Sequence, residues 1–232
     1  MNAKADQLMP AEGILLVDKP IGCTSFAMVA KARRKFGVKK IGHGGTLDPF
    51  ASGLLVLLVG RSYTKRASEF LEGDKEYQAR LFLGTATDTF DLDGTPTDVS
   101  DYVPTQQEIE TVVASFQGPQ LQVPPMFSAK KIAGKRLYEL AREGKVVERA
   151  AVQVDIAISN IRYEFPYLDI LVRCSKGTYI RSLAHDIGRS LGTFAHLVAL
   201  RRTRSGNFAV TDACTAESLQ DPASILDSYI QR

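Results

Sequence analysis

The sequence is poor in the residues that build disulfide frameworks and metal sites. Its 232 residues include three cysteines, three histidines and no tryptophan. The cysteines, Cys23, Cys174 and Cys214, lie far apart, with neither C-x-x-C pairs nor histidines at ligand spacing. This usage indicates neither a disulfide framework nor a zinc site, and it fits a reducing compartment. We therefore predict a cytoplasmic protein that holds no metal.

Long apolar runs are also missing. No run approaches the roughly 18 residues that span a bilayer, so we expect no membrane span. The first residues, MNAKADQLMPAEG, lack the apolar core of a secretory signal, and we expect residues 1–12 to form a flexible tail. With 44% hydrophobic and 24% charged residues, the composition is ordinary for a soluble globular protein.

The net charge of +3 is small, but the charges are unevenly distributed. Residues 72–110 contain ten acids and two bases, whereas residues 31–40 contain six bases and no acid. Residues 173–204 contain seven bases and one acid, Asp186. Such a basic face suits a polyanion such as RNA or DNA, because each neutralised phosphate releases counterions. A merely solvated surface is equally compatible with charge alone.

Hydrophobic periodicity predicts one mixed α+β domain over residues 13–232, because neither a repeat nor a flexible linker divides the chain. Strands are expected over residues 13–20, 54–60, 75–84, 152–165, 168–177 and 196–208. Helices are expected over residues 23–37, 62–73, 106–118, 135–144 and 178–192. Residues 85–105 read as a long polar loop, and prolines keep residues 118–129 extended.

Two of these helices carry local signals. In the helix that ends at Gly37, the expected N-cap is Thr24 or Ser25. Its expected apolar stripe is Phe26, Val29 and Ala30. In the helix over residues 178–192, the expected cap is Thr178. Its expected buried stripe is Ile180, Leu183, Ala184, Ile187 and Leu191.

The stretch GHGGTLDPFASGLL, residues 42–55, contains a single carboxylate, Asp48. Asp followed by Pro is a common start of a helix or turn, and this is the simplest local interpretation. The four glycines around it also permit close approach of another molecule, which a plain turn does not require. The stretch lacks the Lys-Ser/Thr ending of a nucleotide-binding P-loop.

Other candidate residues have two interpretations each. His43 is either a general base or base-contacting group, or a hydrogen-bonded loop histidine. Tyr77 and Tyr179 are either core residues with a polar tip or stacking platforms. Arg181 lies in the first turn of a predicted helix, where the macrodipole disfavours a cation, so an anionic partner is indicated. A glycosidase would ordinarily need a second carboxylate near Asp48, and none is close in sequence.

The stretch GHGGTLDPFASGLL resembles the signature of the TruB-type pseudouridine synthases, which isomerise uridine 55 in the T-loop of bacterial tRNA. Other motifs agree with that family in order and spacing. They are GILLVDKPIGCTS, DKEYQARLFLGTATDTFDLDG, VPPMFSAKKIAGKRLYELAREG, CSKGTYIRSLAHDIG and LRRTRSG. The resemblance runs from about Gly13 to Asn207, which is nearly the whole chain.

The resemblance implies a pseudouridine synthase catalytic fold, in which a mixed, largely antiparallel sheet is flanked by helices and crossed by a basic active-site cleft. It implies that Asp48 is the catalytic aspartate and that Arg181 pairs with it, favouring the ionised carboxylate. Tyr77 is implied in both catalysis and binding of the base. The remaining implied substrate-binding residues are His43, Tyr179, Leu200, Lys19 and Pro20.

The implied chemistry explains why one acid suffices. The C1′–N1 bond is broken, the uracil rotates while held, and C5 is joined to C1′, so no water is added. The buried target base must be flipped into a pocket and held there by stacking. The exchange within one nucleotide implies neither a metal nor an organic cofactor. Whether Asp48 attacks C1′, attacks C6 or removes a 2′ proton stays open.

Many bacterial relatives continue into an RNA-binding PUA module, and we expect that module to be absent here. The expected consequences are a weaker grip on the acceptor stem and a greater reliance on T-arm contacts. A monomer is expected. Three alternatives stay open: a synthase acting on ribosomal RNA, a non-catalytic RNA-folding module, and a glycoside hydrolase that releases free uracil.

Overall fold

The computed structural model describes residues 12–132, 134–219 and 230–231. The chain divides into two compact units, one made by residues 1–73 and 201–232 and the other by residues 74–200. The predicted tail, apart from its last residue, lies outside the described residues. The prediction of a single domain over 13–232 stays a prediction.

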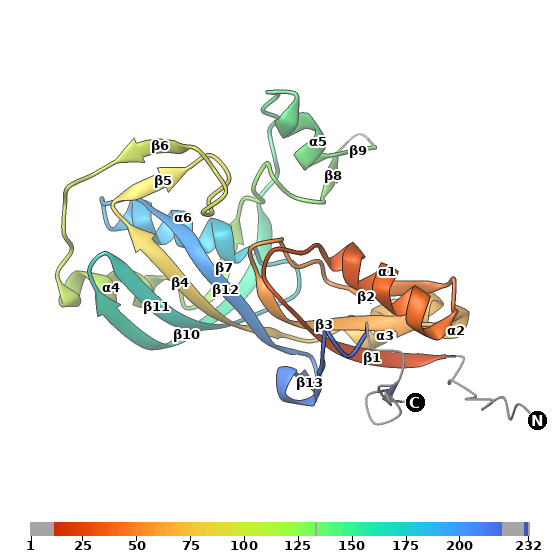
Figure 1. Ribbon diagram of the computed structural model, residues 1–232. Helices are drawn as coiled ribbons and strands as arrows, with labels where there is room; N and C mark the ends of the chain where they lie inside the picture. Colours follow the sequence, from red (N-terminus) through yellow and green to blue (C-terminus); the bar gives the residue numbers. More distant parts are fainter. Residues whose placement is uncertain (1–11, 133, 220–229, 232) are drawn as a thin grey trace, which may run out of the picture. The chain divides into compact units, whose positions relative to one another are not determined.

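The first unit is built around strand β3 (Figure 1). Its elements are β1 (Gly13–Lys19), α1 (Ser25–Phe36), β2 (Ile41–Gly44), β3 (Ser52–Val59), α2 (Arg61–Lys65), α3 (Ala67–Leu71), β13 (Phe208–Ala209), the 3-10 helix η1 (Val210–Asp212), β14 (Cys214–Thr215) and β15 (Ile230–Gln231). Strand β3 pairs antiparallel with β1 along its length and with β2. It also pairs in parallel with residues 201–202 of β12 (Ala195–Ser205).

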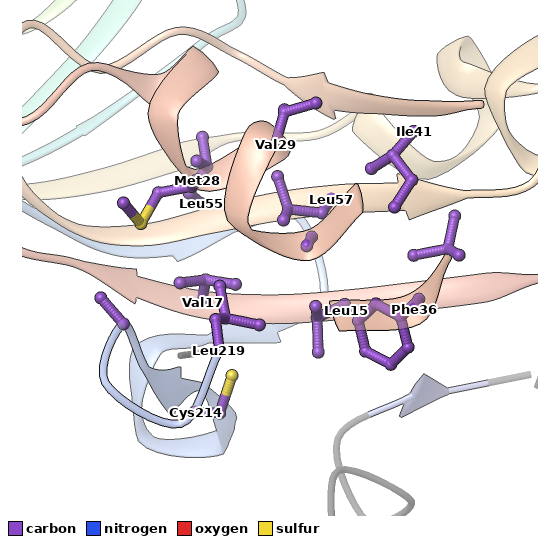
Figure 2. Close-up of a cluster of buried hydrophobic side chains, with 13 residues drawn as sticks. Leu15, Val17, Met28, Val29, Phe36, Ile41, Leu55, Leu57, Cys214 and Leu219 are labelled. Carbon is purple, nitrogen blue, oxygen red and sulfur yellow. The ribbon is translucent and has the colours of Figure 1, made fainter. Parts of the chain in front are cut away.

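Both faces of β3 are buried, as its unbroken apolar run predicts. Residues 54–59 are each at most 1% exposed. On one face, Leu55 and Leu57 pack with Leu15 of β1 against α1 (Figure 2). On the other face, Leu54, Val56 and Leu58 form a second cluster with residues of β1. The segment that leads into β3 is therefore anchored to a closely packed core.

Helix α1 begins and ends where the sequence predicts. Thr24 is the N-cap, its hydroxyl oxygen accepting from the backbone N–H of Ala27, and Gly37 ends the helix at φ 65°. The predicted stripe is wrong for Phe26, whose side chain is 61% exposed. The buried residues are Ser25, Met28, Val29, Ala32 and Phe36. At 3.6 residues per turn, Phe26 lies about 200° around the helix from Met28, so it faces away from the core.

The second unit is dominated by antiparallel strands in the order β4-β11-β10-β7. Its elements are β4 (Lys75–Leu83), β5 (Thr85–Thr87), β6 (Pro96–Val99), α4 (Gln106–Ser115), β7 (Gly118–Gln122), β8 (Lys131–Ile132), β9 (Lys135–Arg136), α5 (Leu137–Arg142), β10 (Val152–Glu164), β11 (Tyr167–Cys174) and α6 (Ile180–Ser190), followed by the first part of β12. Helix α4 contacts β10, and α6 contacts β4.

Antiparallel ladders flanked by helices confirm the predicted α+β class. The buried stripe of α6 is also confirmed, from Ile180 to Leu191. Three expectations are wrong in detail. The polar loop over 85–105 contains the β5–β6 hairpin, and the helix over 62–73 is divided at Arg66 into α2 and α3. The first two residues of the helix predicted over 135–144 form β9. No helix in the described part of the chain is long and apolar enough to cross a membrane.

Candidate functional site

Asp48 lies in the turn that connects β2 to β3. Its carbonyl accepts from the backbone N–H of Ala51 at 3.1 Å, and Pro49 occupies the second position of the turn. The neighbouring side chains of Leu47 and Phe50 are buried, while Asp48 itself is half-buried. Of the two local interpretations, the structure has the turn and not the start of a helix, because residue 52 begins a strand.

The backbone on both sides of Asp48 is held by α1 and the segment before it. The Ser25 hydroxyl donates to the carbonyl of Leu47 at 3.1 Å and accepts from its N–H at 2.9 Å. The N–H of Gly22 donates to the carbonyl of Pro49 at 2.8 Å. Because Ser25 is 2% exposed, water competes little for these bonds. The position of Asp48 is thus fixed from the residue before it and the residue after it.

Arg202 on β12 is a site residue to which sequence reasoning gave no role. It is 1% exposed, and its guanidinium donates to the carbonyl of Leu54 at 2.7 Å and to that of Gly45 at 3.0 Å. It therefore ties both ends of the Asp48 segment to the sheet. The backbones of Arg202 and Gly53 lie close together, and only glycine permits this. Gly53 has φ +100°, and a Cβ there would lie 2.3 Å from the Arg202 carbonyl oxygen.

Lys19, at the end of β1, is a second buried cation near Asp48. Its side chain is 0% exposed, and its Nζ donates to the carbonyls of Pro20 at 2.9 Å and Cys23 at 2.8 Å. Burial lowers the pKa of Lys19, while the charges of Cys23 and Asp48 oppose that shift and Arg202 adds to it. These bonds fix the chain that enters α1, and the supporting role implied for Lys19 and Pro20 stays a prediction.

His43 lies on β2, opposite Leu57 of β3, and is half-buried. Its Nδ1 is buried and has no hydrogen-bond partner among the described residues. Burial lowers the pKa of His43, and the nearby charge of Arg202 lowers it further. The imidazole is therefore neutral at pH 7 and can offer one donor and one acceptor to a neutral ring.

The stability of the first unit is expected to fall as the pH is lowered below about 6.5. The pKa of His43 is lowered in the folded protein, so between that pKa and the ordinary value of 6.5 the unfolded chain binds more protons. The free energy of unfolding is therefore highest above pH 6.5 and decreases as the pH falls through this window. Urea unfolding at pH 8, 7, 6 and 5 would measure it. His43→Gln should flatten the curve, and an unchanged slope in that variant would contradict the assignment.

Tyr77 and Leu200 lie on strands of the second unit. Tyr77 is opposite Val172 of β11 and is half-buried, while the alternate residues that follow it on the same face of β4, Ala79, Leu81 and Leu83, are buried. Leu200 on β12 is 8% exposed. Tyr77 thus lies at the less buried end of this face of β4. Its ring is partly accessible, which stacking on another ring would require.

Tyr179 is fixed through its backbone by Gln122 at the end of β7. The Gln122 side-chain amide accepts from the N–H of Tyr179 at 2.8 Å and donates to its carbonyl at 3.1 Å. Helix α6 begins at Ile180 with Tyr179 as N-cap and no side-chain cap. The expectation that Thr178 caps it is wrong, because the Thr178 hydroxyl donates to the carbonyl of Ser175 instead.

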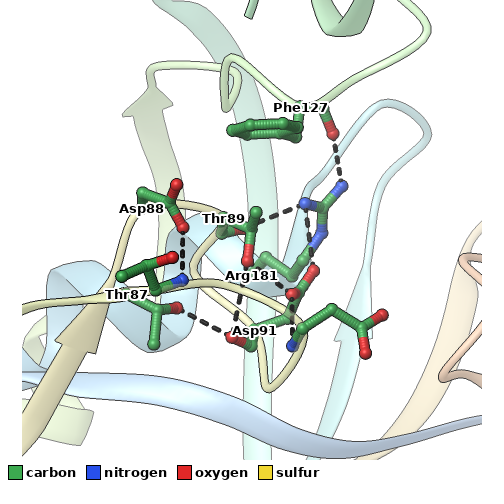
Figure 3. A network of polar contacts seen from close by, with 8 residues as sticks. Thr87, Asp88, Thr89, Asp91, Phe127 and Arg181 are labelled. Atoms are coloured by element: carbon green, nitrogen blue, oxygen red, sulfur yellow. Dashed lines mark hydrogen bonds and ion pairs between the residues drawn. The ribbon is translucent and has the colours of Figure 1, made fainter. Parts of the chain in front are cut away.

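Arg181 is buried and held by three groups, shown in Figure 3. Its guanidinium donates to the carbonyl of Thr89 at 3.0 Å and to that of Phe127 at 2.7 Å. The Asp91 carboxylate lies 3.3 Å from it, and both side chains are at most 7% exposed. Asp91, which lies in the acidic segment read as a loop, is thus one anionic partner of Arg181. The predicted pairing of Arg181 with Asp48 stays a prediction.

Asp91 is itself fixed within the turn over residues 87–94. One carboxylate oxygen accepts from the Thr89 hydroxyl at 2.5 Å and from the N–H of Asp93 at 3.1 Å. The Thr87 hydroxyl donates to the Asp91 carbonyl at 2.7 Å (Figure 3). These bonds satisfy a carboxylate that would otherwise be expensive to bury.

The predicted site residues fall into two sets. The first unit holds Lys19, Pro20, His43 and Asp48, and the second holds Tyr77, Tyr179, Leu200 and Arg181. The first set lies together around the Asp48 turn, since Lys19 interacts electrostatically with Asp48, and both Lys19 and His43 with Arg202. No group of His, Cys, Asp or Glu side chains within the described ranges is arranged to hold a metal ion.

Solved structures with this fold include one chain from a Cbf5–Nop10–Gar1 complex. The two match with a TM-score of 0.67 and 31% identity over 89% of this chain and 53% of that chain. A chain of an H/ACA RNP bound to a substrate RNA containing 2′-deoxyuridine matches with a TM-score of 0.64, 29% identity, and coverage of 89% and 51%. The protein spans about half the length of these solved chains.

Curated relatives match over most of their length. The tRNA pseudouridine synthase B of Protochlamydia amoebophila is 50% identical over 220 residues, covering 95% of this chain and 84% of the relative. The protein of that name from Chlamydia muridarum is 52% identical over 213 residues, covering 92% and 88%.

Family models cover nearly all of the described chain. The model described as TruB family pseudouridylate synthase (N terminal domain) matches residues 33–180. The model described as tRNA pseudouridylate synthase B C-terminal domain matches residues 181–231. Together with the fold, these matches define a pseudouridine synthase, an enzyme that isomerises uridine to pseudouridine. Within that class, the chain belongs to the TruB family.

Proposed function

We propose that the protein isomerises uridine 55 in the T-loop of tRNA to pseudouridine, with Asp48 as its catalytic residue. The observation that carries this proposal is the fixation of the Asp48 turn. Ser25, Gly22 and Arg202 hold its backbone through direct hydrogen bonds. Catalytic groups must be held close to their productive geometry, and a half-buried carboxylate on a turn anchored in this way meets that need.

The proposal gives each remaining residue a role. The Tyr77 ring stacks on the flipped uracil and takes part in catalysis, and neutral His43 offers hydrogen bonds to the base rather than a charge. Tyr179 and Leu200 line the uracil pocket. Lys19 and Pro20 support the chain beside Asp48. Arg181 balances the charge of Asp48 within the basic cleft that we propose across the sheet.

The T-arm is the part of the tRNA that we propose the protein contacts, through residues 31–40 and 130–142. In the first segment Arg34, Lys39 and Lys40 are exposed. In the second segment, the exposed basic side chains are those of Lys131, Lys135, Arg136 and Arg142. Phosphate contacts from these residues can offset the few kcal/mol that flipping the base requires.

Isomerisation within one nucleotide involves neither net redox change nor hydrolysis, so we propose that it proceeds without a metal or organic cofactor. We further propose that the protein acts as a monomer in the cytoplasm, where tRNA is the available substrate.

The proposal is tested by tritium release from a tRNA transcript labelled at C5 of uridine. Joining C5 to C1′ displaces the C5 hydrogen, so turnover is expected to release one tritium for each modified uridine 55. A transcript with cytidine at position 55 is the control and should release none. Release from that control transcript, or free uracil on chromatography, would overturn the proposal in favour of another uridine or of a glycoside hydrolase.

An isolated T-arm hairpin is expected to bind nearly as well as full-length tRNA, within about tenfold, or 1.4 kcal/mol. The reason is that the exposed lysines and arginines of residues 31–40 and 130–142 are proposed to contact the T-arm. Filter binding at two salt concentrations would measure both dissociation constants and their salt dependence. A loss of affinity of a hundredfold or more with the hairpin would contradict it.

A further inference from the structure

Helix α6 carries two side chains that contact the turn over residues 87–94. Arg181 and His185 are four residues apart, so they lie on the same face of the helix, one turn apart. Arg181 binds the turn through the Thr89 carbonyl and the Asp91 carboxylate. His185 contacts the residue between them, Phe90, whose ring it stacks on with centroids 3.9 Å apart and an interplanar angle of 18°. The turn is therefore attached to α6 at two adjacent points.

Phe90 has an unusual backbone for a bulky residue, with φ 64°. Such a conformation persists only where its surroundings fix it. Here the N–H of Phe90 donates to the carbonyl of Thr87 at 3.2 Å, and its carbonyl accepts from the N–H of Leu197 at 3.0 Å. The reversal at Phe90 lets the groups on both sides of it, the Thr89 carbonyl and the Asp91 carboxylate, face Arg181.

The His185 ring lies flat against Phe90 in this stack. Its Nδ1 is buried and makes no hydrogen bond to any described residue. Burial lowers the pKa of His185, the charge of Arg189 one turn further along α6 lowers it more, and Asp98 on β6 opposes the shift. The ring is consequently uncharged at neutral pH, which keeps a second cation away from Arg181.

We propose that His185 is a positioning residue for Arg181: its ring holds Phe90 in the reversed conformation and so fixes the two groups that aim the guanidinium. This inference rests on the proposed function, because it takes Arg181 to be part of the catalytic site. His185 takes no part in the chemical step itself. It acts through Phe90 on the Thr89 carbonyl and the Asp91 carboxylate.

Steady-state kinetics of His185→Ala and His185→Phe on tRNA test the proposal. His185→Ala is expected to lower kcat by about tenfold, with KM unchanged within twofold, because misaiming a charged group affects the reaction more than RNA binding. His185→Phe keeps a flat ring and should restore kcat to within twofold of wild type. His196→Ala is the matched control, because His196 also packs on a phenylalanine, Phe82 of β4, at 5.4 Å, and should keep wild-type kcat.

A second variant removes the other ring. Phe90→Gly should show the same fall in kcat, because glycine adopts φ 64° without strain but also populates many other conformations once the stack is lost. The double variant with His185→Ala should be no slower than either single variant. Full activity of His185→Ala, failure of His185→Phe to restore it, or multiplicative losses in the double variant would each overturn the positioning role. An active wild type then leaves the proposed function standing, whereas a wild type inactive on tRNA overturns both.

Discussion

Asp48→Asn is expected to abolish pseudouridine formation while leaving tRNA affinity within about tenfold of wild type, or 1.4 kcal/mol. The amide is nearly isosteric with the carboxylate, so the turn held by Ser25 and Arg202 should keep its shape. An amide, however, neither attacks the ribose or the ring nor accepts a proton at neutral pH. Attack on C1′, attack on C6 and removal of a 2′ proton by Asp48 therefore all predict the same loss of product. Tritium release and filter binding with one tRNA transcript measure the two quantities.

A matched control separates the role of Asp48 from a general effect of charge. Asp212 lies in the same unit and is exposed, so Asp212→Asn removes one negative charge without touching the turn. It should keep wild-type turnover. A product yield from Asp48→Asn comparable to that of Asp212→Asn would refute the catalytic assignment. Loss of tRNA binding in Asp48→Asn, with binding retained in Asp212→Asn, would instead indicate that the Asp48 side chain contributes to the RNA-binding surface.

Much of the fold could be predicted because its main elements carry strong local signals. The unbroken run of β3 and the cap and terminal glycine of α1 depend on residues that are neighbours in sequence. Strands β5 and β9 are two or three residues long, which is too short for any alternation to be recognised. The orientation of Phe26 on α1 could not be predicted, because a large apolar residue near a helix start can point to solvent as well as to the core.

The candidate site was predicted less evenly, and sequence distance explains why. Asp48 and its glycines stand together in one short stretch, so their pattern is visible. The residues that hold them are remote: Arg202 reaches a carbonyl 148 positions away, and Gln122 fixes a backbone 57 positions away. The adjacent arginines in LRRTRSG offered a signal, since alternation along a strand places one of them inward. Asp91 offered none, because its neighbours include several other acids.

Arg181→Met is expected to destabilise the second unit by about 3–5 kcal/mol, the range for removing one partner of a buried ion pair. Methionine is unbranched and apolar, and it replaces most of the length of the arginine side chain. The change therefore tests the loss of charge more than the loss of volume. The Asp91 carboxylate loses the guanidinium at 3.3 Å while staying buried, and the carbonyls of Thr89 and Phe127 lose their donor. Urea unfolding followed by circular dichroism would measure the change.

The exposed pair between Arg66 and Glu69 provides the control for this effect. Both side chains are more than half exposed, so water replaces the lost partner and Arg66→Met should leave the midpoint unchanged. Arg181→Met with Asp91→Leu should recover part of the lost stability, because the uncompensated charge is removed together with its partner. Recovery of stability without recovery of turnover would show that the Arg181 cation serves the reaction as well as the fold. Equal midpoints for Arg181→Met and Arg66→Met would contradict the view that the Arg181–Asp91 pair is a buried structural link.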